Sequence, residues 1–285
     1  MKKKIIIQGA GKGTRTFKIS TDSIFDYVAY FDRNLKILPE DEGRLDGIPL
    51  HNDPSLISKM QYDYIFMRAQ GVTLIQREYH NLYGIPYEKM IPIKHIGGKS
   101  KFDQIASLAN EIAFHGIPGS VAELGVNYGD TAFWINVFFN DRTFYLFDTF
   151  TGFDGRDVDF EKEKGTMRPE EVHYFDLGRS PEGVMGKLLF KDQAVIKQGY
   201  FPDSLDGLED TFSFVHIDCD LQKPIQAGLE YFYPRLSKGG AICVHDFRSL
   251  RYPGARIAVR EFCAKHNIIY TPIFEYGGVV IRKPF

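Results

Sequence analysis

The fold is decided by two stretches, Phe212-Ser-Phe-Val-His-Ile-Asp-Cys-Asp220 and Gly239-Gly-Ala-Ile-Cys-Val-His-Asp-Phe247, which a helical run from Leu221 to Leu236 connects. Each stretch reads as a short apolar strand that ends on polar residues. The run between them is long enough to cross back over a sheet. A right-handed crossover of this kind makes the two strands parallel neighbours in one sheet.

Four polar side chains follow these strands: Asp218, Asp220, His245 and Asp246. Because the carboxyl ends of parallel strands meet at one edge of a sheet, we expect these side chains to lie close together. Clustered carboxylates repel one another unless a cation, a proton or a substrate hydroxyl offsets the repulsion. The cluster therefore predicts a functional site rather than ordinary packing.

Length and composition are those of a globular protein with two domains. The chain has 285 residues, of which 44% are hydrophobic and 25% charged, and this length is typical of two domains with ample core. The formal net charge is -2 and no dense basic block follows Lys4, so nucleic acid is not an expected partner. The three cysteines show no paired spacing, which favours a reducing compartment over a disulfide scaffold.

Apolar runs in the sequence are short. The start of the chain has a basic head but only three consecutive apolar residues, and no run elsewhere is long enough to span a bilayer. We therefore expect a cytoplasmic protein without a membrane span. The sequence does not fix the oligomeric state, and a homo-oligomer is compatible with it.

The first 97 residues predict a small α/β module. Residues 4–8 form a β-type run that enters the turn Gly9-Ala-Gly-Lys-Gly-Thr14, and two further strands end at Asp32 and Met67. A strand, a glycine turn, a helix and a strand ending in an acid form the order of a dinucleotide-binding fold, in which backbone N–H groups approach a pyrophosphate. Three strands make half of such a fold.

Three interpretations of this glycine turn stay open. The glycines can simply tighten a strand-to-helix turn, or they can form a nucleotide or nucleotide-sugar pocket in which Asp32 accepts a ribose hydroxyl. The third is a nucleotidyltransferase, because Gly11-Lys-Gly-Thr-Arg15 looks like the glycine-rich signature of sugar nucleotidyltransferases. The segments that follow resemble instead the half-Rossmann modules that precede sugar-modifying enzymes. Lys12 precedes Gly13 rather than Ser or Thr, which excludes a P-loop.

Residues 98–285 predict a second domain, with Gly97-Gly98 at the boundary. A buried strand enters a glycine turn after Glu123, and the next strand ends on Asp148, at the distance expected for a ribose ligand. The charged segment 151–179 is long for a connection and predicts a lid or a substrate-binding insertion. We count seven strands, the last one antiparallel, which is the Rossmann-like plan of class I methyltransferases.

Five motifs of this domain carry a family resemblance, and together they are similar to the macrocin O-methyltransferase family, which methylates sugar hydroxyls on antibiotics. The resemblance covers about residues 98–285. The motifs are Glu123-Leu-Gly-Val-Asn-Tyr-Gly-Asp-Thr131, Phe147-Asp-Thr-Phe-Thr-Gly-Phe153, Gly199-Tyr-Phe-Pro-Asp-Ser-Leu205, His216-Ile-Asp-Cys-Asp-Leu221 and Gly239-Gly-Ala-Ile-Cys-Val-His-Asp-Phe247.

The resemblance implies a site for S-adenosylmethionine. The first motif would cradle the methionine part, Asp148 would hold the ribose hydroxyls, and Tyr200 would lie near the adenine. The residues that the resemblance assigns to the cofactor are Glu123, Gly125, Asn127, Tyr128, Gly129, Thr131, Asp148, Tyr200 and Asp218.

The resemblance also implies a divalent metal, Mg or Mn, held by Asp218, His245 and Asp246, with Asp220 as the general base. His245 departs from the family pattern because it replaces an acid, and imidazole suits Mn, Fe or Zn better than Mg. A second departure is Gln222, which stands where the family more often has Tyr. His245 can alternatively act as the base or hydrogen-bond Asp246.

The implied function is S-adenosylmethionine-dependent, metal-assisted methylation of a hydroxyl on a sugar or glycoconjugate, as in polysaccharide biosynthesis. One alternative is an O-methyltransferase for a phenolic hydroxyl. Another is a non-enzymatic nucleotide-sugar binding protein in which the first module does the work. Structural interpretations also remain, since Glu123 can cap a helix, Asp148 can terminate a strand and His216 reads as a core histidine.

Overall fold

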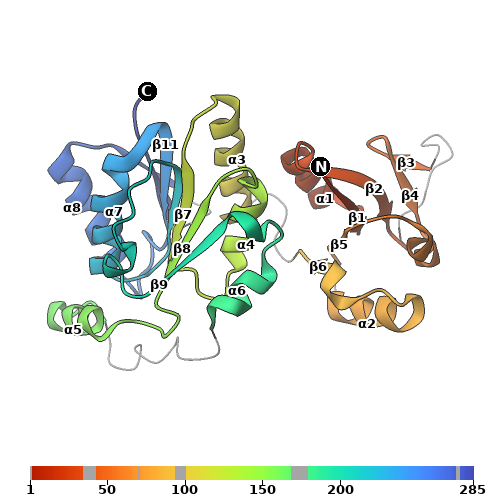
Figure 1. The fold of residues 1–285 in the computed structure, drawn as a ribbon, viewed down its shortest axis with the longest axis horizontal. Helices are drawn as coiled ribbons and strands as arrows, with labels where there is room; N and C mark the ends of the chain where they lie inside the picture. The colour runs from red at the N-terminus through yellow and green to blue at the C-terminus, as the bar shows by residue number, and fades with distance from the viewer. Residues whose placement is uncertain (1, 35–42, 70, 94–100, 168–178, 274–276) are drawn as a thin grey trace. The chain divides into compact units, whose positions relative to one another are not determined.

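The chain forms two compact units, Met1–Asp103 and Gln104–Phe285 (Figure 1). The computed structural model describes residues 2–34, 43–69, 71–93, 101–167, 179–273 and 277–285. The predicted boundary at Gly97-Gly98 lies outside the described residues. The division between the two compact units falls within the first turn of helix α3 (Lys101–Phe114).

The first unit is built on a six-stranded sheet with the order β3-β4-β2-β1-β5-β6. All neighbouring strands run parallel except β3, which pairs antiparallel with β4. The elements are β1 (Lys3–Gln8), α1 (Lys12–Thr21), β2 (Phe25–Phe31), β3 (Arg44–Leu45), β4 (Ile48–His51), β5 (Tyr64–Met67), α2 (Val72–Tyr83) and β6 (Met90–Pro92), with 3-10 turns at Pro54–Lys59 and Tyr87–Lys89.

The prediction of three strands for this unit was wrong, because three further strands exist. The missed strands have two to four residues each, too few to show a period of two in the sequence. The three predicted strands form the centre of the sheet and carry its most buried side chains. Those include Ile6, Phe31 and Met67, each at most 1% exposed.

The second unit is built on a seven-stranded sheet with the order β12-β13-β11-β10-β7-β8-β9. Its pairs are parallel except those of β13, which runs antiparallel to β11 and to β12. The predicted class I methyltransferase plan is confirmed. The strands are β7 (Ser120–Leu124), β8 (Phe144–Asp148), β9 (Ala194–Gln198), β10 (Phe212–Ile217), β11 (Leu236–Val244), β12 (Tyr270–Ile273) and β13 (Gly278–Arg282).

Helices cover both faces of this sheet, as Figure 1 shows, with α7 and α8 on one side and α3 and α4 on the other. This arrangement buries both faces of the central strands, and all six residues of β10 are buried, as expected for a strand that reads as a continuous apolar run. The helices are α4 (Asp130–Phe138), α5 (Gly155–Lys164), α6 (Pro181–Lys187), α7 (Gln222–Arg235) and α8 (Gly254–His266), with 3-10 turns at Lys191–Gln193 and Asp203–Leu205.

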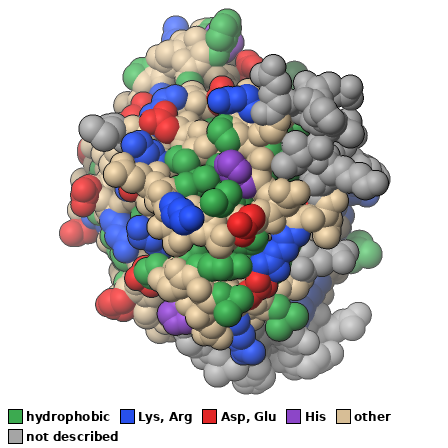
Figure 2. All heavy atoms as spheres, turned by 90° about the vertical axis from the view of Figure 1, so that its right-hand side faces the viewer, with side chains coloured by type: hydrophobic (Ala, Val, Ile, Leu, Met, Phe, Trp, Pro, Cys, Tyr) green, Lys and Arg blue, Asp and Glu red, His purple; other side chains and the backbone are tan. Residues whose placement is uncertain are grey.

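The surface agrees with the near-neutral charge of the sequence. On the face drawn in Figure 2, Lys and Arg are interspersed with Asp and Glu, and no continuous basic field covers it. Among the described residues, every helix is too short or too polar to cross a bilayer.

Candidate active site

The register of three neighbouring strands builds the site. Leu124 at the end of β7 pairs with Ile217 of β10, which pairs in turn with Val244 of β11. The next residues of β10 and β11 continue the ladder, since the Asp218 N–H donates to Leu124 O at 2.8 Å and the His245 N–H donates to Ile217 O at 2.9 Å. Both side chains are therefore fixed at the same edge of the sheet.

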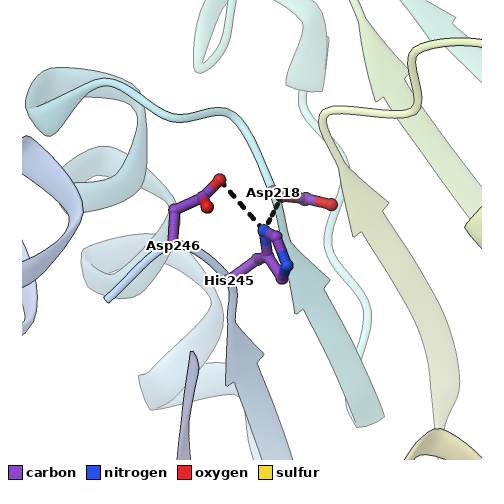
Figure 3. A group of neighbouring side chains, drawn as sticks. All are labelled: Asp218, His245 and Asp246. Carbon is purple, nitrogen blue, oxygen red and sulfur yellow. Dashed lines mark ion pairs between the residues drawn. The ribbon is translucent and has the colours of Figure 1, made fainter. Parts of the chain in front are cut away.

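Three side chains converge at this edge (Figure 3). Nδ1 of His245 lies 2.8 Å from Oδ1 of Asp218 and 2.9 Å from Oδ2 of Asp246. One ring nitrogen carries at most one proton, so it cannot give a full hydrogen bond to both carboxylates. One ligand atom from each of the three residues lies within 4.8 Å of the others. Two carboxylate oxygens and one imidazole nitrogen at this spacing fit a divalent cation.

Asp220 adds a third carboxyl group beside this triad. Burial, its hydrogen bond with Asp246 and the negative charges of Asp246 and Asp218 raise the pKa of Asp220 well above its ordinary value. Burial opposes ionisation of Asp246 as well, but its hydrogen bonds with His245 and Asp220 outweigh burial and lower the pKa of Asp246. Asp220 is thus the carboxyl group of the pair with the higher pKa.

Asp220 and Asp246 both have a left-handed backbone conformation. Their φ angles are 61° and 56°, a conformation that costs most residues about 1–2 kcal/mol and that Asp tolerates better than most. Conformations of this kind cluster at functional sites, where surrounding contacts maintain them.

A cleft of about 690 Å³, open solvent included, extends from Asp218 and Asp220 along the ends of β7, β8 and β9, and His245 and Asp246 are not among the residues that line it. It brings together six of the predicted site residues: Gly125, Asn127, Asp148, Tyr200, Asp218 and Asp220. The cleft also holds polar side chains that sequence reasoning did not single out, namely Asp154, Asp157, Arg179 and Cys219.

Gly125 lines the cleft at a position that has no room for a side chain. Its φ is +89°, and a Cβ built on it would lie 2.3 Å from the backbone oxygen of Asp218. Any side chain here would push β7 away from the loop that carries the acidic cluster. The glycine therefore sets the distance between the glycine turn and Asp218.

Asp148 ends β8 in the cleft and already accepts three backbone hydrogen bonds. Its Oδ2 accepts the N–H groups of Val126 and Asn127 at 2.7 and 2.8 Å, and its Oδ1 accepts the N–H of Phe150 at 2.7 Å. An ionised carboxylate offers about four acceptor sites. Asp148 therefore shapes the glycine turn and keeps room for about one further donor, such as a ribose hydroxyl.

Tyr200 forms a polar network with helix α5. Its hydroxyl donates to Oδ1 of Asp157 at 2.9 Å, and the guanidinium of Arg156 lies 3.5 Å from the centre of its ring. Burial raises the pKa of Asp157, although the bond from Tyr200 lowers it. The charged composition of 151–179 was the sequence signal for polar residues such as Asp157 in the cleft, but no motif identified them individually; residues 168–178 of this segment lie outside the described structure, and its role as a lid or substrate-binding insertion stays a prediction.

Glu123 is buried and is absent from the lining of the cleft. It is opposite His216 in the register of β7 and β10, so the two side chains are on the same face, and Oε1 of Glu123 lies 3.0 Å from Nδ1 of His216. Glu123 is 1% exposed and His216 is fully buried. The structure thus places Glu123 where it supports the sheet edge.

Tyr128, Gly129 and Thr131 are also absent from the cleft lining. Tyr128 is 44% exposed, with the Arg179 guanidinium 5.2 Å from its ring centre. Gly129 has a left-handed φ of +79° and precedes α4, where a Cβ would lie 3.0 Å from Val184. These residues shape the outer side of the glycine turn.

Hydrogen bonds of Asp32 and Thr14 stabilise the glycine turn of the first unit. Oδ2 of Asp32 accepts the Ala10 N–H at 2.9 Å, and Oδ1 accepts the Asn34 N–H at 3.0 Å. The Thr14 hydroxyl donates to Gly9 O at 2.8 Å. These bonds account for the shape of the turn, and nucleotide binding there stays a prediction.

Comparison with known proteins points to one family. The family model of macrocin-O-methyltransferase (TylF) matches residues 91–282, about two thirds of the chain. The 8-demethyl-8-(2,3-dimethoxy-alpha-L-rhamnosyl)-tetracenomycin-C 4'-O-methyltransferase of Streptomyces olivaceus is 26% identical over an alignment of 191 residues, and the match covers 64% of this chain and 71% of that protein. The demethyldecarbamoylnovobiocin O-methyltransferase of Streptomyces niveus is 27% identical over an alignment of 184 residues, and the match covers 60% of this chain and 68% of that protein.

The fold is shared with a solved structure. The O-methyltransferase NovP superposes with a TM-score of 0.53 at 20% identity, and the match covers 82% of this chain and 100% of the NovP chain. At this identity the likeness concerns the fold alone.

Proposed function

The chain belongs to the macrocin O-methyltransferase family, and from this membership we propose that it transfers a methyl group from S-adenosylmethionine to a sugar or glycoconjugate hydroxyl with the help of a divalent cation. One observation carries the proposal: Asp218 and Asp220 line one end of a cleft, and His245 and Asp246 form a cluster with Asp218. The rest of that cleft is lined by Gly125, Asn127, Asp148 and Tyr200, which come from the predicted cofactor motifs.

The sugar acceptor is the finer part of the proposal. The name of the Streptomyces olivaceus relative places its methyl group on a rhamnosyl unit, and family membership supports the same acceptor class here. A sugar hydroxyl is a poor nucleophile at neutral pH, so an enzyme that methylates it must remove the proton and orient the oxygen.

The triad of Asp218, His245 and Asp246 would hold the cation. A bound divalent ion would lower the pKa of the acceptor hydroxyl and neutralise the clustered carboxylates. The donor set, with imidazole in place of one oxygen ligand, favours Mn, Fe or Zn over Mg. We therefore expect activity to depend on a cation and Mn to support it better than Mg.

Asp220 is the proposed general base. Its carboxylate takes the hydroxyl proton as the acceptor oxygen bonds to the methyl carbon, and the bond between that carbon and sulfur breaks with its electron pair returning to sulfur. The raised pKa of Asp220 suits a group that must receive a proton. A divalent cation bound by Asp218 and Asp246 would favour the ionised form of Asp220 before the reaction.

Mass spectrometry of reaction mixtures tests the proposal. The protein is incubated with S-adenosylmethionine and a panel of nucleotide sugars, glycans and simple phenols, with and without a chelator. A mass gain of one methyl group on a sugar, lost with chelator and restored by Mn, is the expected result. Methylation of phenols alone would overturn the sugar assignment, and chelator-resistant activity would overturn the role of the cation.

A further inference from the structure

Helix α5 belongs to the long connection between β8 and β9, and one of its carboxylates is buried. Glu161 is 2% exposed, whereas its neighbour Glu163 on the same helix is exposed. A buried carboxylate costs several kcal/mol unless hydrogen bonds satisfy it. The partners of Glu161 therefore show why it is buried.

Glu161 caps a helix in another part of the domain. Its Oε1 accepts the backbone N–H of Gln222, the first residue of α7, at 2.6 Å, and its Oε2 accepts the hydroxyl of Thr166. The N-cap residue of α7, Leu221, provides no side-chain cap. The first N–H groups of a helix lack partners within the helix, so Glu161 supplies the partner that the local sequence lacks.

Space for this contact is provided by Gly254 at the start of α8. A Cβ on Gly254 would lie 2.7 Å from both Oε1 of Glu161 and the nitrogen of Gln222. Three helices that are far apart in the sequence therefore meet at one carboxylate. The absence of a side chain at residue 254 is a condition for the bond.

The residue whose N–H Glu161 accepts closely follows the proposed base in the sequence. Gln222 follows Asp220 by two residues, and the intervening Leu221 N–H donates to Cys219 O at 2.6 Å. Asp220 has a left-handed φ of 61°, which surrounding contacts must maintain. The loop is thus fixed from within by Cys219 and from outside by Glu161.

We infer that Glu161 is a positioning residue that couples helix α5 to the orientation of Asp220. An apolar cluster attaches the same segment independently: Val158 and Met167 pack with Leu221 and Tyr252, all at most 6% exposed. Loss of the Glu161 carboxylate therefore leaves α5 attached to the domain. It removes the hydrogen bond to the Gln222 N–H, which constrains the loop that contains Asp220. We therefore expect its loss to lower kcat and to leave the affinity for S-adenosylmethionine nearly unchanged.

The test compares Glu161→Ala, Glu161→Gln and the exposed control Glu163→Ala in the full chain. Glu161→Ala is expected to lower kcat at least tenfold while the Kd for S-adenosylmethionine changes less than twofold. Glu161→Gln keeps an acceptor oxygen for the Gln222 N–H and is expected to restore kcat to within about threefold of the parent. Glu163→Ala is expected to leave both values unchanged.

Gly254→Ala provides a second route, because its methyl group separates Glu161 from Gln222 while both residues remain. It is expected to lower kcat in the same direction as Glu161→Ala. Equal kcat in Glu161→Ala and the parent would overturn the inference. Equal losses in the Ala and Gln variants, or a rise in Kd as large as the fall in kcat, would also overturn it.

The turnover measurements rest on the proposed function, whereas amide hydrogen exchange does not. The Gln222 amide is expected to exchange at least tenfold faster in Glu161→Ala than in the parent, and unchanged exchange would refute the capping contact. A parent protein that methylates no sugar but shows this exchange difference would refute the proposed function and leave the contact standing.

Discussion

Replacing Asp220 by Asn tests the chemistry of the site with little structural disturbance. Asn has nearly the size of Asp, and its amide can donate a hydrogen bond to Asp246, the residue with which Asp220 shares one. Asn also tolerates the left-handed backbone found at residue 220. We therefore expect the free energy of unfolding to change by less than about 1 kcal/mol.

Turnover should respond very differently, because an amide cannot accept the hydroxyl proton. General-base catalysis contributes roughly 10²- to 10⁴-fold in rate, which corresponds to about 2.7–5.4 kcal/mol of barrier. Asp220→Asn is expected to lose that factor in kcat. The Kd for S-adenosylmethionine should stay within about threefold, since the remaining cofactor-motif residues are intact.

The assay is methyl transfer followed by mass spectrometry at saturating cofactor, with cofactor affinity measured by calorimetry. Asp206→Asn is the matched control, because Asp206 also has a left-handed φ, of 48°, but is exposed and outside the cleft lining. A kcat within threefold of the parent would refute the base role. A tenfold weaker cofactor affinity would show that Asp220 serves binding instead.

Three further predictions concern the cation, the cleft and its pH response. His245→Ala should weaken Mn binding, measured by calorimetry, by about tenfold or more; unchanged affinity would exclude the triad as the cation site. Gly125→Ala should lower the free energy of unfolding, measured in urea, by about 2–5 kcal/mol, because the left-handed backbone is strained and the new methyl group clashes with Asp218. Gly165→Ala is the control and should cost about 1 kcal/mol, because Gly165 has a φ of +69° but open space around it. Burial raises the pKa of Asp157, so its contribution to stability is present below the ordinary carboxyl pKa and lost as pH rises through the folded value. The melting temperature of Asp157→Asn should therefore rise relative to that of the parent as the pH increases from about 4 to about 7. A difference in melting temperature that shrinks over this range would contradict the burial of Asp157.

The sequence by itself determined the type of the second unit and the edge at which its chemistry lies. The strands β8 and β10 are mostly apolar, and an aspartate stands at or directly after the end of each (Asp148 and Asp218), so their extent and their carboxyl ends can be read locally. The handedness of crossover connections then places those ends together without knowledge of any side-chain contact. The same reasoning missed strands of the first unit that are too short to carry a pattern.

Only the tertiary structure decided which side chains meet. Glu123 and His216 are 93 residues apart, and Glu161 and Gln222 are 61 apart. The first contact depends on strand register and the second on how α5 packs against α7 and α8. Local patterns fix where a strand or helix begins and ends, because those depend on neighbouring residues. A contact across the fold depends on how whole elements pack, so the sequence could indicate a charged insertion but not that its buried Glu161 holds the loop of Asp220.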